Sequence, residues 1–81
     1  MKYVIVIEST NTGFSAYVPD LPGCISVGKT RREVEGYIQE SIMLHIEGLK
    51  EDGEEIPHPT TETMTMDIPN LARKLGILLS C

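Results

Sequence analysis

The 81-residue sequence lacks the features that mark membrane and secreted proteins. No apolar run reaches the length of a bilayer span, and no basic-then-apolar leader follows Met1. Only two cysteines occur, Cys24 and Cys81, and neither has a partner at metal-ligand spacing. We therefore expect a cytoplasmic protein that makes no membrane contact and whose cysteines are free thiols rather than a disulfide.

Catalytic constellations are also missing. The sequence has no glycine-rich phosphate loop and no nucleophile elbow, and Glu8 and Asp20 are the only acids among the first 29 residues, too few for two-metal phosphoryl transfer. His45 falls on the apolar face of a predicted helix, which favours a core histidine, and His58 lies between two prolines without a second metal ligand nearby. We expect no catalytic residue, no metal and no cofactor, and residual nuclease activity stays an open alternative.

Basic residues are scarce in the second half of the chain. The formal net charge is −5, but residues 33–67 contain ten acidic residues and a single basic one, Lys50, so this stretch has a net charge of −9. Such a field repels phosphate backbones and attracts basic surfaces, which favours a basic protein over nucleic acid as the partner. A solvated helix face that aids solubility is the alternative interpretation.

A corner at residues 17–24 is the most informative local feature. Pro19 and Pro22 lack an N–H donor and fix φ near −65°, and Gly23 can adopt the positive φ that redirects the chain. The segment therefore predicts a strand, a tight turn and a second strand.

Apolar patterning predicts three strands before any helix. Residues 2–9 are apolar on both alternating faces, as expected of a central strand, and a turn at residues 10–13 joins them to residues 14–18 as a hairpin. The third strand covers residues 24–29, and we expect Ile25 and Val27 to point inward.

A helix and a fourth strand follow. Thr30 to Glu33 forms a capping box, the helix runs to about Asp52, and Gly53 is its αL stop. The expected buried face contains Val34, Ile38, Ser41, Ile42, His45 and Leu49. The opposite face of the helix carries four acidic residues, Glu33, Glu40, Glu47 and Glu51. Met64, Met66 and Ile68 alternate with polar residues and predict the fourth strand.

The predicted fold class is α+β with the order β-β-β-α-β, one helix packed on one face of the sheet, and a short helical tail that contains Leu71 and Leu75. A right-handed crossover places the fourth strand parallel to the first, on its free side. One helix covers one sheet face only, so the tail or another chain must cover the other face. A domain of this size has a marginal core, and we expect a homo-oligomer.

Four segments together resemble the HicB-type antitoxin family. They are residues 3–8 (YVIVIE), 13–24 (GFSAYVPDLPGC), 30–33 (TRRE) and 44–59 (LHIEGLKEDGEEIPHP), and they occur in the family's order. The resemblance implies a partly ribonuclease-H-like sheet-and-helix domain over residues 1–68. It also implies a non-enzymatic antitoxin of a type II toxin–antitoxin pair, which binds and neutralises a HicA-type toxin, a small basic mRNA interferase.

The acidic loop supplies the expected partner-binding residues, which are Glu47, Glu51, Asp52, Glu54 and Glu55. Longer family members append a DNA-binding motif, whereas residues 69–81 here form a short tail that resembles only the first helix of such a motif, a possible remnant. DNA binding by this chain is therefore doubtful, because a helix-turn-helix needs a second helix in the major groove. The alternative function is an orphan HicB-like oligomeric regulatory or ligand-binding module without a toxin partner.

Overall fold

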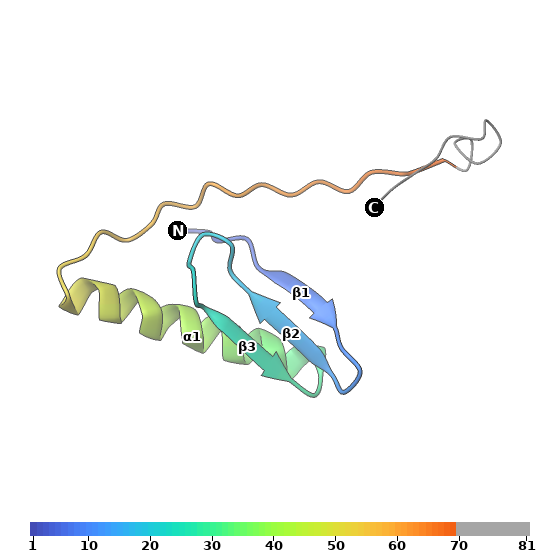
Figure 1. Ribbon diagram of the computed structural model, residues 1–81, viewed down its shortest axis with the longest axis horizontal. Coiled ribbons are helices and arrows are strands. Elements are labelled where there is room, and N and C mark those ends of the chain that lie inside the picture. Colours follow the sequence, from blue (N-terminus) through green and yellow to red (C-terminus); the bar gives the residue numbers. More distant parts are fainter. Residues whose placement is uncertain (70–81) are drawn as a thin grey trace.

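A three-stranded antiparallel sheet with one long helix on one side forms the body of the protein (Figure 1). The computed structural model describes residues 1–69. Its elements are β1 (Val6–Ser9), β2 (Phe14–Tyr17), β3 (Ile25–Gly28) and α1 (Arg31–Glu51). The α+β class is confirmed, and the predictions on residues 70–81, including the helical tail, lie outside the described residues.

Both predicted turns between strands are present. At the β1–β2 hairpin, Thr10 N–H donates to Gly13 O at 2.8 Å, and Ser9 pairs with Phe14. At the corner, Gly23 has φ 86°, and Leu21 N–H donates to Val18 O at 3.0 Å. The proline-glycine corner therefore turns the chain from β2 into β3 as the sequence predicts.

The ends of α1 also follow the sequence. Thr30 is the N-cap, and its hydroxyl accepts from Glu33 N–H at 3.1 Å. The Glu33 carboxylate accepts from Lys29 N–H at 3.4 Å, one residue before the donor expected in a capping box. Asp52 caps the other end, and Gly53 follows with φ 70°.

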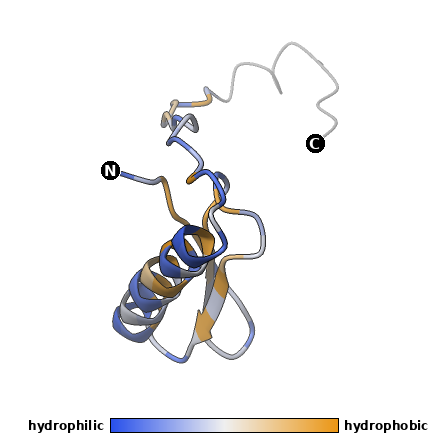
Figure 2. Ribbon diagram, turned by 90° about the vertical axis from the view of Figure 1, so that its left-hand side faces the viewer, coloured by the Kyte–Doolittle hydropathy of each residue, from blue (hydrophilic) through white to orange (hydrophobic). Residues whose placement is uncertain are grey.

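The core lies between α1 and the sheet, where the apolar stripe of the helix faces the strands (Figure 2). Its buried members are Ala16, Val18, Leu21, Cys24, Val34 and Ile38. The predicted helix face is confirmed, because Val34 and Ile38 are buried and Ile42 packs against them. His45 is only half-buried, so it lies at the margin of the core rather than inside it.

The predicted position of the first strand is wrong. The strand begins at Val6 rather than at Lys2, and β1 lies at the edge of the sheet, with β2 in the centre. The fourth strand, which would have placed β1 mid-sheet, is not formed within residues 1–69. Residues 64–68 lie without strand pairing, and Met64, Met66 and Ile68 are 78%, 62% and 72% exposed.

The predicted orientation of β3 is also wrong. Ile25 and Val27 are 64% and 70% exposed and point away from the helix. The reason is the close approach of α1, since a Cβ on Gly28 would lie 2.8 Å from Val34 N. Only small residues fit between β3 and α1, and there Ser26 Oγ lies 2.9 Å from Ser41 Oγ. The larger side chains therefore occupy the other face.

After α1, polar contacts hold residues 54–61, which we call the connector, against the body. Tyr3 Oη donates to Pro57 O at 2.6 Å. The N–H groups of Thr60 and Thr61 both donate to Asp20 Oδ2 at 3.0 Å, and their hydroxyls donate to Oδ1 at 3.0 and 2.8 Å, an arrangement we call the Asp20 clasp. Residues 62–69, the arm, start on the β1 side of the sheet and leave the body (Figure 1).

Candidate partner-binding surfaces

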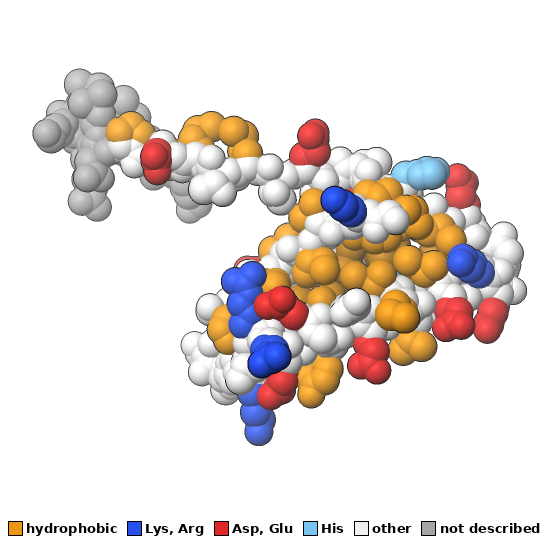
Figure 3. All heavy atoms as spheres, turned by 180° about the vertical axis from the view of Figure 1, so that it is seen from behind, with side chains coloured by type: hydrophobic (Ala, Val, Ile, Leu, Met, Phe, Trp, Pro, Cys, Tyr) orange, Lys and Arg blue, Asp and Glu red, His pale blue; other side chains and the backbone are white. Residues whose placement is uncertain are grey.

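The five acidic residues expected to bind a partner lie together at one end of the molecule. Glu47 and Glu51 belong to the last turns of α1, Asp52 is its C-cap, and Glu54 and Glu55 follow directly. All five are exposed. The ion pairs within residues 1–69 do not include them, and acidic side chains are visible at this end in Figure 3.

The acidic end concentrates negative potential. The C-terminus of a helix has a partial negative charge, so each carboxylate in the last turn is unfavourable by about 0.3–1 kcal/mol at low salt. Lys50 is the basic residue of that turn. The partial negative charge of the helix end and the charges of the exposed carboxylates therefore add to one another. This arrangement lowers the stability of the fold, but it creates a surface that attracts cations.

A second surface is the sheet face opposite α1. Val6 pairs with Tyr17, and Tyr17 pairs with Ile25, so these side chains form one apolar row across the three strands. Val27 extends the apolar area along β3. No element within the described residues covers this face, and contiguous exposed apolar area is typical of an interaction surface.

Sequence reasoning missed this outer face because it turned Ile25 and Val27 inward. A signal was present in the alternation of small and large residues in β3. Ser26 and Gly28 leave space for a helix, whereas Ile25 and Val27 do not.

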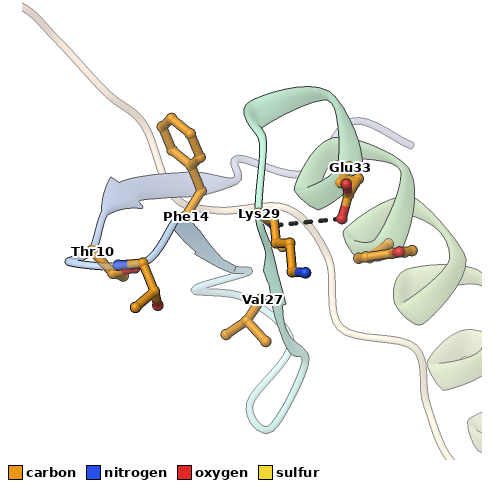
Figure 4. A pocket seen from close by; sticks show the side chains of 8 residues that line it. Thr10, Phe14, Val27, Lys29 and Glu33 are labelled. Carbon is orange, nitrogen blue, oxygen red and sulfur yellow. Dashed lines mark hydrogen bonds between the residues drawn. The ribbon is translucent and has the colours of Figure 1, made fainter.

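A shallow pocket of about 560 Å³ lies where the hairpin, β3 and α1 meet (Figure 4). It is lined by Thr10, Thr12, Phe14, Val27, Gly28, Lys29, Glu33 and Tyr37. Its only charged side chains are Lys29 and Glu33, and the Glu33 carboxylate already accepts from the Lys29 N–H. Phe14 and Val27 point away from each other in Figure 4, so the lining does not converge on a ligand.

Reactive groups are scarce in the described part of the chain. Among residues 1–69, no group of three or more His, Cys, Asp or Glu side chains could hold a metal ion. Burial raises the pKa of the Cys24 thiol, which keeps it protonated and a poor nucleophile. No helix within those residues combines the length and apolar character needed to cross a membrane.

Asp20 carries the clearest electrostatic perturbation. The hydrogen bond from the Thr61 backbone N–H, reinforced by the hydroxyls of Thr61 and Thr60 and the Thr60 N–H, lowers the pKa of the Asp20 carboxyl, against a smaller desolvation effect that raises it. Asp20 remains ionised at neutral pH, and its four hydrogen bonds give it a structural role.

Comparison with known proteins identifies the family. The model of the HicB-like antitoxins of bacterial toxin–antitoxin systems matches residues 3–80. The chain belongs to this family. The resemblance found in the sequence is thereby confirmed: the chain is a member of a family of antitoxins of bacterial toxin–antitoxin systems.

Individual relatives show how much of each protein the HicB-like chain covers. It is 49% identical over 57 residues, 70% of the chain, to an uncharacterised 14.9 kDa protein of Haemophilus phage HP1, and 32% identical over 62 residues, 76% of the chain, to the Antitoxin HicB 2 of Photorhabdus laumondii. It spans under half the length of each, 43% and 45%. A UPF0150 protein of Thermoplasma acidophilum is 40% identical over 67 residues, which cover 82% of this chain and 97% of that protein.

A solved structure shares the fold. A chain of the HicA3 and HicB3 toxin–antitoxin complex matches with a TM-score of 0.64 and 35% identity, over 74% of this chain and 70% of that one. The three antiparallel strands and the helix of this HicB-like chain are therefore consistent with a fold found in a toxin–antitoxin assembly.

Proposed function

We propose that the protein is the antitoxin of a type II toxin–antitoxin pair and that it acts in the cytoplasm by binding and neutralising a small basic HicA-type mRNA interferase. The observation that carries the proposal is the structural match to a chain of a HicA3–HicB3 complex at 35% identity. The proposal assigns the toxin contact to the acidic end, Glu47, Glu51, Asp52, Glu54 and Glu55.

Charge complementarity supports this assignment. The acidic end is exposed and is not neutralised by ion pairs within residues 1–69, so its field extends into solvent. A basic partner that acts on RNA carries the opposite charge, and complementary fields mainly accelerate association. The proposed role of the five carboxylates is therefore to steer the toxin onto the antitoxin and to occupy the basic surface that would otherwise meet RNA.

The test is a charge-neutralised variant in which Glu47, Glu51, Glu54 and Glu55 become Gln and Asp52 becomes Asn. With a HicA-type toxin encoded beside the gene, we expect the association rate at low salt to fall about 10-fold or more and its salt dependence to flatten. Stopped-flow or surface-binding kinetics over a range of salt concentrations measure both quantities. Circular dichroism checks that the fold is retained.

A matched control separates position from net charge. It neutralises five acidic residues elsewhere, namely Glu8, Glu35, Glu40, Glu62 and Asp67. We expect a much smaller fall in the association rate. Equal effects of the two variants would reject the acidic end as the contact, and absence of any toxin binding by the unmodified chain would favour the oligomeric module without a toxin.

The same field predicts weak binding of duplex DNA. A net charge of −5 opposes phosphate, and the described residues present no recognition helix. An electrophoretic shift with operator DNA from upstream of the gene should therefore show no tight complex at physiological salt. Tight binding would show that DNA recognition resides in this chain.

A further inference from the structure

The solvent face of α1 contains large apolar side chains among its acidic residues. Tyr37, Met43 and Leu44 are 47%, 63% and 67% exposed. At 100° per residue they flank a line of carboxylates on the side of the helix opposite the buried Val34 and Ile38. Figure 3 shows acidic and apolar side chains next to one another along the lower border of the molecule, where α1 lies. We call this surface the helix ridge, and its members are Tyr37, Glu40, Met43, Leu44 and Glu47.

The carboxylate of Glu40 at the centre of the helix ridge is not neutralised by its neighbours. Ion pairs along a helix form between residues three or four positions apart. The residues at these distances from Glu40 are Gly36, Tyr37, Met43 and Leu44. None of them is basic, and no ion pair within residues 1–69 includes Glu40. Its charge therefore stays available to a cation of another molecule.

Solubility alone does not explain the helix ridge. A helix face that meets only water is polar throughout, and a single exposed apolar side chain needs no explanation. Here three large apolar side chains lie within about two turns of the helix. Adjacent apolar side chains, including an aromatic residue and a methionine, with charged residues beside them are typical of an interface with another protein.

The charges of the helix ridge define the chemistry of its partner. Glu40 and Glu47 repel phosphate groups and anionic membrane surfaces, and they equally repel the same ridge of a second copy. A basic protein surface with apolar side chains between its cations is complementary to both kinds of residue. The ridge also continues into the acidic end, because Glu47 belongs to both. One basic partner can therefore cover the two surfaces together.

We propose that the helix ridge is the part of the toxin contact that determines how long the complex lasts. The inference rests on the proposed function and extends the contact from the acidic end along α1 as far as Tyr37. Tyr37, Met43 and Leu44 are the apolar anchors that the toxin covers. Glu40 pairs with a cation of the toxin, and the covered anchors exclude water from that pair.

The acidic end and the helix ridge then have separable kinetic roles. Exposed charges act over a distance and mainly set the association rate. Apolar side chains act only once they are covered, so their removal mainly raises the dissociation rate. The two surfaces are therefore distinguished by which rate constant changes when each is altered.

The test measures binding kinetics of the complete chain with the HicA-type toxin encoded beside the gene. The double variant Met43→Ala with Leu44→Ala should raise the dissociation rate about 30-fold or more, because it removes two apolar anchors. The association rate should change less than about 3-fold, since the net charge stays at −5. Alanine is the best helix former and both side chains are exposed, so circular dichroism and thermal melting should show that the fold is retained.

The matched control, Ile25→Thr with Val27→Thr, removes apolar surface from the sheet face opposite α1, where the two side chains are 64% and 70% exposed. Threonine is β-branched and keeps the strand propensity. The dissociation rate of this control should stay within about 2-fold of that of the unmodified chain, because the sheet face lies outside the proposed contact. Glu40→Gln should raise the dissociation rate even at salt concentrations that screen the acidic end.

The possible outcomes separate this inference from the proposed function. If the unmodified chain does not bind the toxin, both are overturned. If it binds but the dissociation rate is unchanged in the Met43→Ala, Leu44→Ala variant, or rises equally in the control, only the inference is overturned. A direct check uses a soluble gadolinium chelate, whose relaxation effect on the methyl groups of Met43 and Leu44 should fall when the toxin binds. An undiminished effect would overturn the inference as well.

Discussion

The body and the connector of this HicB-like chain are stabilised by different forces. The sheet and α1 are joined by buried apolar side chains, chiefly Leu21, Val34 and Ile38. The connector is held by hydrogen bonds at the surface, from Tyr3 to Pro57 and from two threonines to Asp20. The difference teaches that one chain can combine a body held by its apolar core with a segment that is held by a few polar contacts and can detach locally.

The largest effect is expected from the apolar contact of the body. Ile38 is fully buried against the sheet, so Ile38→Ala should lower the free energy of unfolding by about 3 kcal/mol through lost burial and a residual cavity. Leu44 on the same helix is 67% exposed, and Leu44→Ala should change stability by less than about 0.5 kcal/mol. Urea denaturation at one protein concentration compares the two. Similar losses would show that α1 does not pack as described.

The next effect concerns the Asp20 clasp. Asp20→Ala removes the acceptor of four hydrogen bonds at once, so the Thr60 and Thr61 amides should lose hydrogen-exchange protection while the amides of β2 keep theirs. Asp20→Asn retains one acceptor oxygen and should lose less. A matching loss of protection in β2 would mean that the connector and the body unfold together.

The clasp should also respond to acid. Its hydrogen bonds lower the pKa of the Asp20 carboxyl from 3.8, so the stabilisation is complete above about pH 4 and is lost as the pH falls through the lower folded-state value. The amide chemical shifts of Thr60 and Thr61 should therefore titrate with a midpoint below 3.8. The Asp20→Ala variant should show no such transition, and a midpoint above 3.8 would contradict the described geometry.

Local signals made most of the fold predictable from the sequence. Gly23 and Gly53 have the positive φ values that their positions required, and Thr30 caps α1 as expected. Each of these features depends on a few neighbouring residues. The arrangement of the strands depends on residues that are far apart in the sequence. The sequence analysis therefore wrongly placed the first strand in the centre of the sheet and wrongly turned Ile25 inward.

The candidate binding surfaces also include features that depend on neighbouring residues and features that depend on residues far apart in the sequence. The acidic end was predictable because its five residues are close in sequence around the end of one helix. The apolar row on the sheet face opposite α1 was not, because it depends on the pairing of three strands. The Asp20 clasp joins residues 40 and 41 positions apart, and no periodicity in the sequence indicates such a contact.

The smallest effect is expected at the other anchor of the connector. Tyr3→Phe removes the hydroxyl that donates to Pro57 O at 2.6 Å and leaves that carbonyl to water, which should cost about 1 kcal/mol. Tyr37→Phe is the matched control, since Tyr37 is an exposed residue of α1 and no hydrogen bond of its hydroxyl is found within residues 1–69. Because one bond is lost rather than four, exchange at Pro57's neighbours should rise less than it does at Thr60 in Asp20→Ala. Equal stability of the two tyrosine variants would show that the connector depends on the clasp alone.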